Sequence, residues 1–110
     1  MEKKQKALAI DFDGVIHDRA NPIEGRKMGA PIHGAKDALF RLKMRGYKII
    51  VHCLWADSPE NIATIAKWMD FYDCQYNDIT NIKPDADYFI DNKAIKFTDW
   101  EEVLENFKEC

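Results

Sequence analysis

Three carboxylates and one lysine in this sequence have the types and spacing that phosphate chemistry needs. Asp11 and Asp13 follow a short apolar run within Asp-Phe-Asp-Gly, and Asp91 follows a later apolar run. Lys83 stands before a proline in an irregular segment that precedes Asp91. Crowded carboxylates repel one another unless a cation or a proton shares the site, and oxygen ligands without Cys or His favour Mg²⁺. The pattern indicates a magnesium-assisted phosphate site.

The strands expected to position these residues are short and apolar. Runs at residues 7–10, 48–52 and 88–90 are typical of buried parallel strands, and a further short strand is expected near residues 75–79. Residues two apart on an extended segment point to the same side, so Asp11 and Asp13 should share a face. Because ligands gather at the carboxyl ends of parallel strands, the residues that follow these runs carry the most weight.

Amphipathic spacing predicts three helices between and after the strands. The first should stop before Gly46, the second has an N-cap at Ser58, and the third should begin at a capping box over residues 98–101. Strands that alternate with helices imply βαβ crossovers. The expected fold class is therefore α/β, a three-layer Rossmann-like sandwich in which helices cover both faces of a central parallel sheet.

Composition limits the remaining possibilities. A chain of 110 residues, 46% of them apolar, should form one domain over residues 1–110, with a loop or hairpin flap at about 16–33. A formal charge of −3 with scattered basic residues argues against nucleic-acid binding through bulk electrostatics. The apolar run before Asp11 is too short for a signal peptide or a membrane span. Three cysteines without CxxC spacing fit a reducing compartment, so we expect a cytoplasmic protein without zinc.

In these residues the chain resembles the haloacid dehalogenase-like superfamily. The resemblance covers most of the chain, and four segments match the family motifs in order: Asp11-Phe-Asp13-Gly-Val, Lys48 to Cys53, Lys83-Pro84, and Phe89-Ile-Asp91. The resemblance implies a sheet with strand order 5-4-1-2-3. The segment between Asp13 and Cys53 has room for one helix and a modest flap but not for a cap domain, so a capless, open site is expected.

The resemblance also implies a role for each matching residue. Asp11 would attack phosphorus and form an aspartyl-phosphate, and Asp13 would protonate the leaving group and then activate water. Lys83 would hold Asp11 and the phosphate. Mg²⁺ would bind to Asp11, to the backbone carbonyl of Asp13 and to Asp91. The implied activity is Mg²⁺-dependent hydrolysis of phosphomonoesters, and the two-step chemistry agrees with the need for a nucleophile and a nearby acid and base.

Two positions depart from the family pattern. Cys53 stands where Ser or Thr usually donates to phosphate, so phosphate binding should rely more on the following backbone N–H groups, beginning at Leu54. Two interpretations of Cys53 stay open, an inert buried thiol and a reactive nucleophile. Asn92 stands after Asp91 where a second acid is common, so it is expected around the metal ion without binding it directly, and Mg²⁺ binding should be weaker.

The expected partner is a phosphorylated substrate, either a small molecule or an exposed phosphate on a larger one, including a nucleic-acid end. Arg19, Arg26, Lys27 and His33 in the flap could meet an anionic substrate, and Trp55 could stack on a base or sugar or simply pack. Two alternatives to hydrolysis remain. One is a catalytically degenerate module that binds Mg²⁺ or phosphate, and the other is a phosphotransferase that uses the same aspartyl-phosphate.

Overall fold

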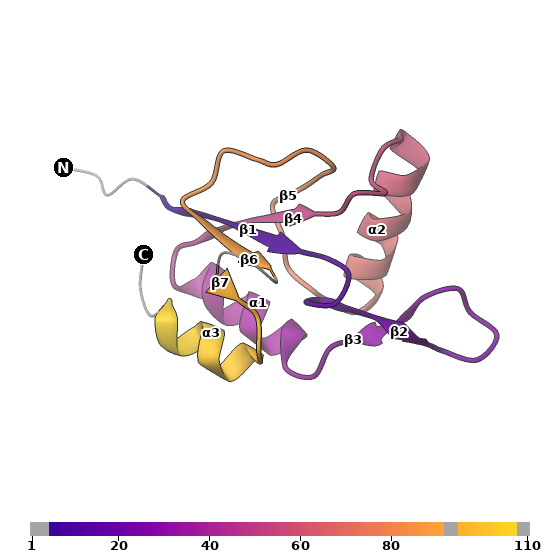
Figure 1. The fold of residues 1–110 in the computed structure, drawn as a ribbon, viewed down its shortest axis with the longest axis horizontal. Helices are drawn as coiled ribbons and strands as arrows, with labels where there is room; N and C mark the ends of the chain where they lie inside the picture. The colour runs from indigo at the N-terminus through magenta and orange to yellow at the C-terminus, as the bar shows by residue number, and fades with distance from the viewer. Residues whose placement is uncertain (1–4, 92–94, 108–110) are drawn as a thin grey trace.

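The computed structural model describes residues 5–91 and 95–107 as an α/β fold built on a parallel sheet (Figure 1). Strand β1 (Ala7–Asp11) lies between β4 (Lys48–His52) and β6 (Tyr88–Asp91), and all three are parallel. β5 (Asp78–Thr80) extends the β4 edge and the two-residue β7 (Ile95–Lys96) extends the β6 edge, which gives the order β5-β4-β1-β6-β7. The expected parallel α/β sheet is confirmed, although β5 begins later than residue 75.

Three helices form where apolar side chains recur at helical spacing. In α1 (Ala35–Met44) the predicted stripe is buried, and the helix ends before Gly46, which adopts a φ of +99°. α2 (Pro59–Phe71) begins after Ser58, whose hydroxyl accepts a hydrogen bond from the backbone N–H of Asn61 at 3.1 Å. These boundaries agree with the sequence pattern because caps act locally.

The third helix, α3 (Trp100–Asn106), begins one residue later than a capping box at Thr98 predicts. Asp99 is the N-cap, and its carboxylate accepts from the backbone N–H of Glu102 at 2.8 Å. The Thr98 hydroxyl instead donates to the side chain of Glu102. Asp99 therefore takes the capping role, since its carboxylate accepts from an N–H in the first turn of the helix.

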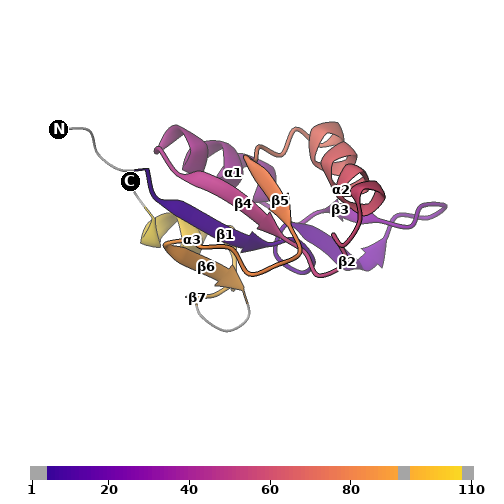
Figure 2. The same cartoon turned by 90° about the horizontal axis from the view of Figure 1, so that it is seen from above.

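The core lies on one face of the sheet. Leu8, Ile10, Ile49, Val51 and Ile90 alternate with residues on the other face and are fully buried in one cluster with side chains from all three helices. The opposite face is crossed by the segment 81–87, which arches over the sheet on the side away from α1 and α3 (Figures 1 and 2).

The second helical layer of the expected three-layer sandwich is therefore missing from the described residues. The cause is the connection from β5 to β6. A helical crossover between parallel strands needs about a dozen residues or more, and the segment 81–87 is shorter and contains Pro84. It crosses the sheet as an irregular segment and leaves room for a cavity between itself and the strands.

The segment expected to be a loop or flap forms an antiparallel hairpin, β2 (His17–Pro22) and β3 (Gly29–Pro31), which projects past the carboxyl end of β1 (Figure 1). It is anchored to α2 by the indole N–H of Trp68, which donates to the carbonyl of Gly29 at 2.9 Å. In the part of the chain that the structure describes, no helix combines the length and apolarity needed to cross a membrane.

Candidate active site

Asp11 ends the central strand and is flanked by residues that end its two neighbours. The parallel register places Asp11 opposite His52 at the end of β4, and Ile10 opposite Ile90, so that Asp91 ends β6 on the other side. A cavity of about 270 Å³ lies over these strand ends and is lined by Ala9, Asp11, His52, Lys83, Pro84, Phe89 and Asp91. Asp11, Lys83 and Asp91, which are far apart in sequence, thus line one cavity.

A second cavity of about 210 Å³ lies on the hairpin side of Asp11. Its lining residues are Asp11, Phe12, Asp13, Arg19, His52, Cys53, Leu54 and Trp55. Asp11 and His52 belong to both cavities. Asp11 is therefore bordered by two cavities, one lined also by Lys83 and Asp91 and the other by Asp13 and Arg19.

The environment of Asp11 disfavours its charge. Burial raises the pKa of the Asp11 carboxyl, and the negative charges of Asp91 and Asp13 raise it further. The hydrogen bond from His52 acts in the opposite direction, with Nδ1 of His52 at 3.2 Å from Oδ1 of Asp11. The negative charges of Asp91 and Asp13 would favour a cation beside Asp11 when its carboxyl is ionised.

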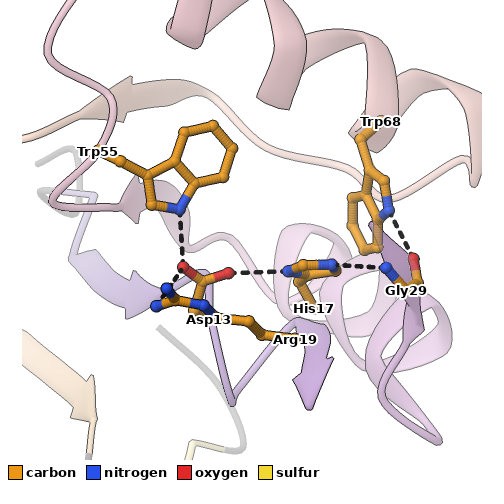
Figure 3. A network of polar contacts seen from close by, with 6 residues as sticks. All are labelled: Asp13, His17, Arg19, Gly29, Trp55 and Trp68. Carbon is orange, nitrogen blue, oxygen red and sulfur yellow. Dashed lines mark hydrogen bonds and ion pairs between the residues drawn. The ribbon is translucent and has the colours of Figure 1, made fainter. Parts of the chain in front are cut away.

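Asp13 is held by donors from three directions (Figure 3). Nδ1 of His17 lies 2.8 Å from Oδ1, the indole N–H of Trp55 donates to Oδ2 at 2.7 Å, and the guanidinium of Arg19 lies 3.8 Å from Oδ2. His17 is buried and Arg19 is 74% exposed. Arg19 is therefore accessible to an anion that enters the second cavity, whereas His17 serves Asp13 from inside the protein.

The other flap residues lie elsewhere. The guanidinium of Arg26 lies over the ring of Phe71, 5.8 Å from its centroid, and His33 lines a separate cavity beside α1. Of the four cationic candidates, Arg19 is the one that lines a cavity with Asp11 and Asp13. Trp55 has a polar role that the sequence did not indicate, because its N–H holds Asp13.

Cys53 lines the second cavity, but its backbone N–H has a partner inside the fold. Its backbone N–H already donates to the carbonyl of Thr80 at 3.0 Å, so it is not available to a phosphate. The following residue, Leu54, is 79% exposed and lines the same cavity. Burial raises the pKa of the Cys53 thiol to about 11, which keeps it protonated and poorly nucleophilic at neutral pH.

The family resemblance implies phosphate release, and replacing Cys53 with Ser is expected to leave that activity within about threefold of the parent, because a buried, protonated thiol packs rather than reacts. Ser keeps the size and a hydrogen-bonding group, and Cys74→Ser, at a second buried thiol outside both cavities, is the matched control. Steady-state phosphate release measures both variants. A loss of about 100-fold or more in Cys53→Ser alone would show that the thiol is the nucleophile.

Lys83 and Asp91 line the cavity under segment 81–87. The ammonium of Lys83 lies over the ring of Phe89, 4.7 Å from its centroid. Among the described residues, no group of three or more His, Cys, Asp or Glu side chains forms a ready-made metal site. Asn92 lies outside the described residues.

The donors that are present fit Mg²⁺ as a weakly held ion. Mg²⁺ is usually bound by one or two carboxylates and keeps several waters and substrate phosphate oxygens. Asp11 and Asp91 supply two carboxylates at one cavity, close enough for Asp91 to raise the pKa of Asp11. The ligand set is all oxygen, and phosphate would complete it. Mg²⁺ binding at this site should therefore depend on bound substrate more strongly than it would at a site made entirely of protein ligands.

Two residues of this site are not evident from the sequence pattern. In the sequence His52 stands out only as the neighbour of Cys53, yet its partner is Asp11 on the adjacent strand. Aligning the two apolar runs from their first residues, Ala7 and Lys48, would have placed His52 beside Asp11, as the observed register does. His17 lies four residues after Asp13 in the sequence, but the contact between them depends on the fold of the hairpin.

Comparison with known proteins bears on the fold alone. No protein-family model matches this sequence, and no curated protein matches it. Among solved structures, the crystal structure of an MCSG target from Vibrio cholerae is similar, with a TM-score of 0.57 and 18% sequence identity over 94% of this chain and 98% of that chain. At this identity the likeness supports the α/β fold, and the chemistry has to be argued from the residues.

Proposed function

We propose that this protein hydrolyses phosphomonoesters with Mg²⁺, with Asp11 as the nucleophile and Asp13 as the general acid and base. The observation that carries the proposal is the position of Asp11 between two cavities. One cavity offers Lys83 and Asp91 for a phosphate and its metal ion, and the other offers Asp13 for the leaving group. Phosphoryl transfer to a carboxylate needs positive charge beside the phosphoryl oxygens and an acid beside the leaving group, and Asp11 has a candidate for each on either side.

The strand order supports membership of the haloacid dehalogenase-like superfamily. Counting only the strands of the main sheet in chain order, β7-β6-β1-β4-β5 becomes 5-4-1-2-3, which is the order the family resemblance implies. The insertion between β1 and α1 consists of the β2–β3 hairpin, which supports a capless, open site. Such a site suits a small phosphate ester or a phosphate exposed on a larger molecule.

In the first step a carboxylate oxygen of Asp11 attacks phosphorus, and the ester P–O bond breaks. Asp13 gives its proton to the departing oxygen, and the phosphoryl group is now bonded to Asp11. His52 holds Oδ1 of Asp11 by its Nδ1–H and so fixes the direction of the nucleophile. Lys83 supplies positive charge to the phosphoryl oxygens. Mg²⁺, when bound, would neutralise charge shared by the phosphate and the carboxylates.

In the second step Asp13, now ionised, takes a proton from a water molecule. The oxygen of that water attacks phosphorus and the bond to Asp11 breaks, which releases inorganic phosphate and restores both carboxyl groups. The exposed Arg19 lies beside Asp13 and is positioned to hold the anionic part of a substrate.

A panel of phosphate esters tests the proposal. The purified protein should release phosphate from at least one ester with Mg²⁺, release should stop in EDTA, and excess Mg²⁺ should restore it. The panel should include nucleotides, sugar phosphates, a phosphopeptide and a 3′- or 5′-phosphorylated oligonucleotide, because the open site does not select among them. Metal-independent release, or none from any ester, would contradict the assigned reaction.

Cys53 in place of Ser or Thr and Asn92 in place of an acid favour a second candidate, a degenerate module that binds phosphate and Mg²⁺ without turnover. Calorimetric binding of phosphate with Mg²⁺ in the absence of release would identify it. Transfer of the phosphoryl group to an added alcohol in preference to water would instead identify a phosphotransferase.

A further inference from the structure

His17 is a buried imidazole to which the proposed mechanism gives no step. It is 3% exposed, stacks on Phe12 with ring centroids 4.9 Å apart, and meets the ring of Trp68 edge-on at 5.3 Å. These contacts alone would make it a packing residue of the hairpin. Both ring nitrogens, however, have polar partners, and one partner is the proposed acid and base Asp13.

The hydrogen bonds around His17 assign its tautomer. The backbone N–H of Gly29 donates to Nε2 at 2.9 Å, so Nε2 carries a lone pair and no hydrogen. The hydrogen of the neutral ring is then on Nδ1, which donates to Oδ1 of Asp13 at 2.8 Å. This contact is therefore a hydrogen bond from a neutral imidazole rather than an ion pair.

The chain of hydrogen bonds continues into α2. The indole N–H of Trp68 donates to the carbonyl of Gly29 at 2.9 Å, so the two peptide groups of Gly29 are held by Trp68 and His17 (Figure 3). The relay runs from Trp68 through Gly29 and His17 to Asp13. Its inner members are buried, which excludes competing water and fixes the imidazole in one orientation.

We propose that His17 is a positioning residue for Asp13, which holds the acid and base in a fixed rotamer through an Nδ1–H tautomer set by the β2–β3 hairpin. The role rests on the proposed phosphohydrolase function. His17 and Trp55 donate to different oxygens of Asp13, so together they fix the plane of its carboxyl group. Proton transfer to a leaving group depends strongly on that geometry, since errors of about 1 Å are costly.

Two variants separate the two hydrogen bonds of His17. His17→Asn places an amide nitrogen close to the position of Nδ1, so it can still donate to Asp13 but no longer accepts from Gly29. His17→Gln places an amide oxygen close to the position of Nε2, so it still accepts from Gly29 but no longer donates to Asp13. A packing role alone predicts that His17→Gln is the better tolerated variant. The positioning role predicts that His17→Asn is the better tolerated one.

The readout is the dependence of rate on the leaving group. An aryl phosphate with a strongly acidic phenol needs little help from a general acid, whereas an alkyl phosphate needs a proton. His17→Gln should lower kcat/KM for the alkyl ester by about 10–100-fold and for the activated aryl ester by less than about 3-fold, with KM little changed. His17→Asn should stay within about 5-fold of the parent on both esters.

Equal losses on both esters in the two variants, or a larger alkyl-ester loss in Asn than in Gln, would overturn the positioning role. The tautomer is measured without turnover: long-range ¹H–¹⁵N spectra should show hydrogen on Nδ1 of His17 and none on Nε2, and hydrogen on Nε2 would also overturn it. A parent that releases no phosphate from any ester would end the phosphohydrolase proposal and this role with it. An active parent with equal losses ends the positioning role alone.

Discussion

Replacing Asp11 with Asn should lower phosphate release by more than about 1,000-fold while the fold persists, because an amide oxygen cannot displace the leaving group from phosphorus. The substitution keeps the shape of the side chain at the end of β1. Asp37→Asn is the matched control, since Asp37 is an exposed carboxylate on α1 paired with Arg41. The control should retain parental activity. An Asp11→Asn protein as active as the parent would defeat the assigned nucleophile.

The same variant has an expected effect on stability that does not depend on turnover. Burial first, and then the charges of Asp91 and Asp13, raise the folded-state pKa of Asp11. A raised pKa means that the folded state prefers protonated Asp11, so the stability from this group is present below the unfolded pKa and is lost as pH rises through the folded value. At neutral pH the parent carries that cost and the Asn variant does not.

We therefore expect Asp11→Asn to be more stable than the parent at neutral pH, with a smaller difference as pH falls toward about 4, near the ordinary pKa of Asp. Urea unfolding in EDTA at several pH values measures this without a bound metal ion. The Asp37→Asn control should show no comparable gain. A variant less stable than the parent at neutral pH would mean that ionised Asp11 is stabilised by its neighbours.

Replacing Gly29 with Ala should destabilise the protein by about 3 kcal/mol or more, because a Cβ has no room there. It would lie 2.1 Å from the backbone oxygen of Asp18 and 2.9 Å from that of Asn21. Both obstacles are backbone atoms of the hairpin, so the clash is relieved only by moving β2 away from β3. That movement would also strain the hydrogen bonds from Gly29 to His17 and from Trp68 to Gly29.

Gly25→Ala is the control for this prediction. Gly25 lies in the turn between the same two strands with φ of +78°, and a Cβ added there would meet nothing within 4 Å. Ala should therefore cost only the strain of the left-handed conformation, about 1 kcal/mol. Equilibrium urea unfolding measures both variants, and kcat/KM should fall further in Gly29→Ala. Equal losses of stability at the two positions would show that the hairpin tolerates opening at Gly29.

Several features of this protein follow from local sequence. The apolar run before Asp11 becomes β1, the stripe of α1 is buried, and Ser58 caps α2, because burial periodicity and capping depend on residues a few positions apart. Asp11, Asp13 and Asp91 are recognisable for the same reason. Each follows a run that is typical of a strand, and strands of a parallel sheet end at one edge.

The tertiary structure determines which side chains come into contact when they are far apart in the sequence. The partner of Asp11 is His52, 41 residues away, and their contact requires the register of β1 with β4. The tautomer of His17 depends on Gly29 and hence on the closure of the hairpin. α1 and α3 lie on one face of the sheet, and the segment 81–87, which is too short for a crossover helix, crosses the other face. That limit becomes apparent only once β5 and β6 are known to lie on opposite sides of the β4–β1 pair. Local periodicity specifies burial, whereas register and side-chain pairing arise from packing of the whole chain.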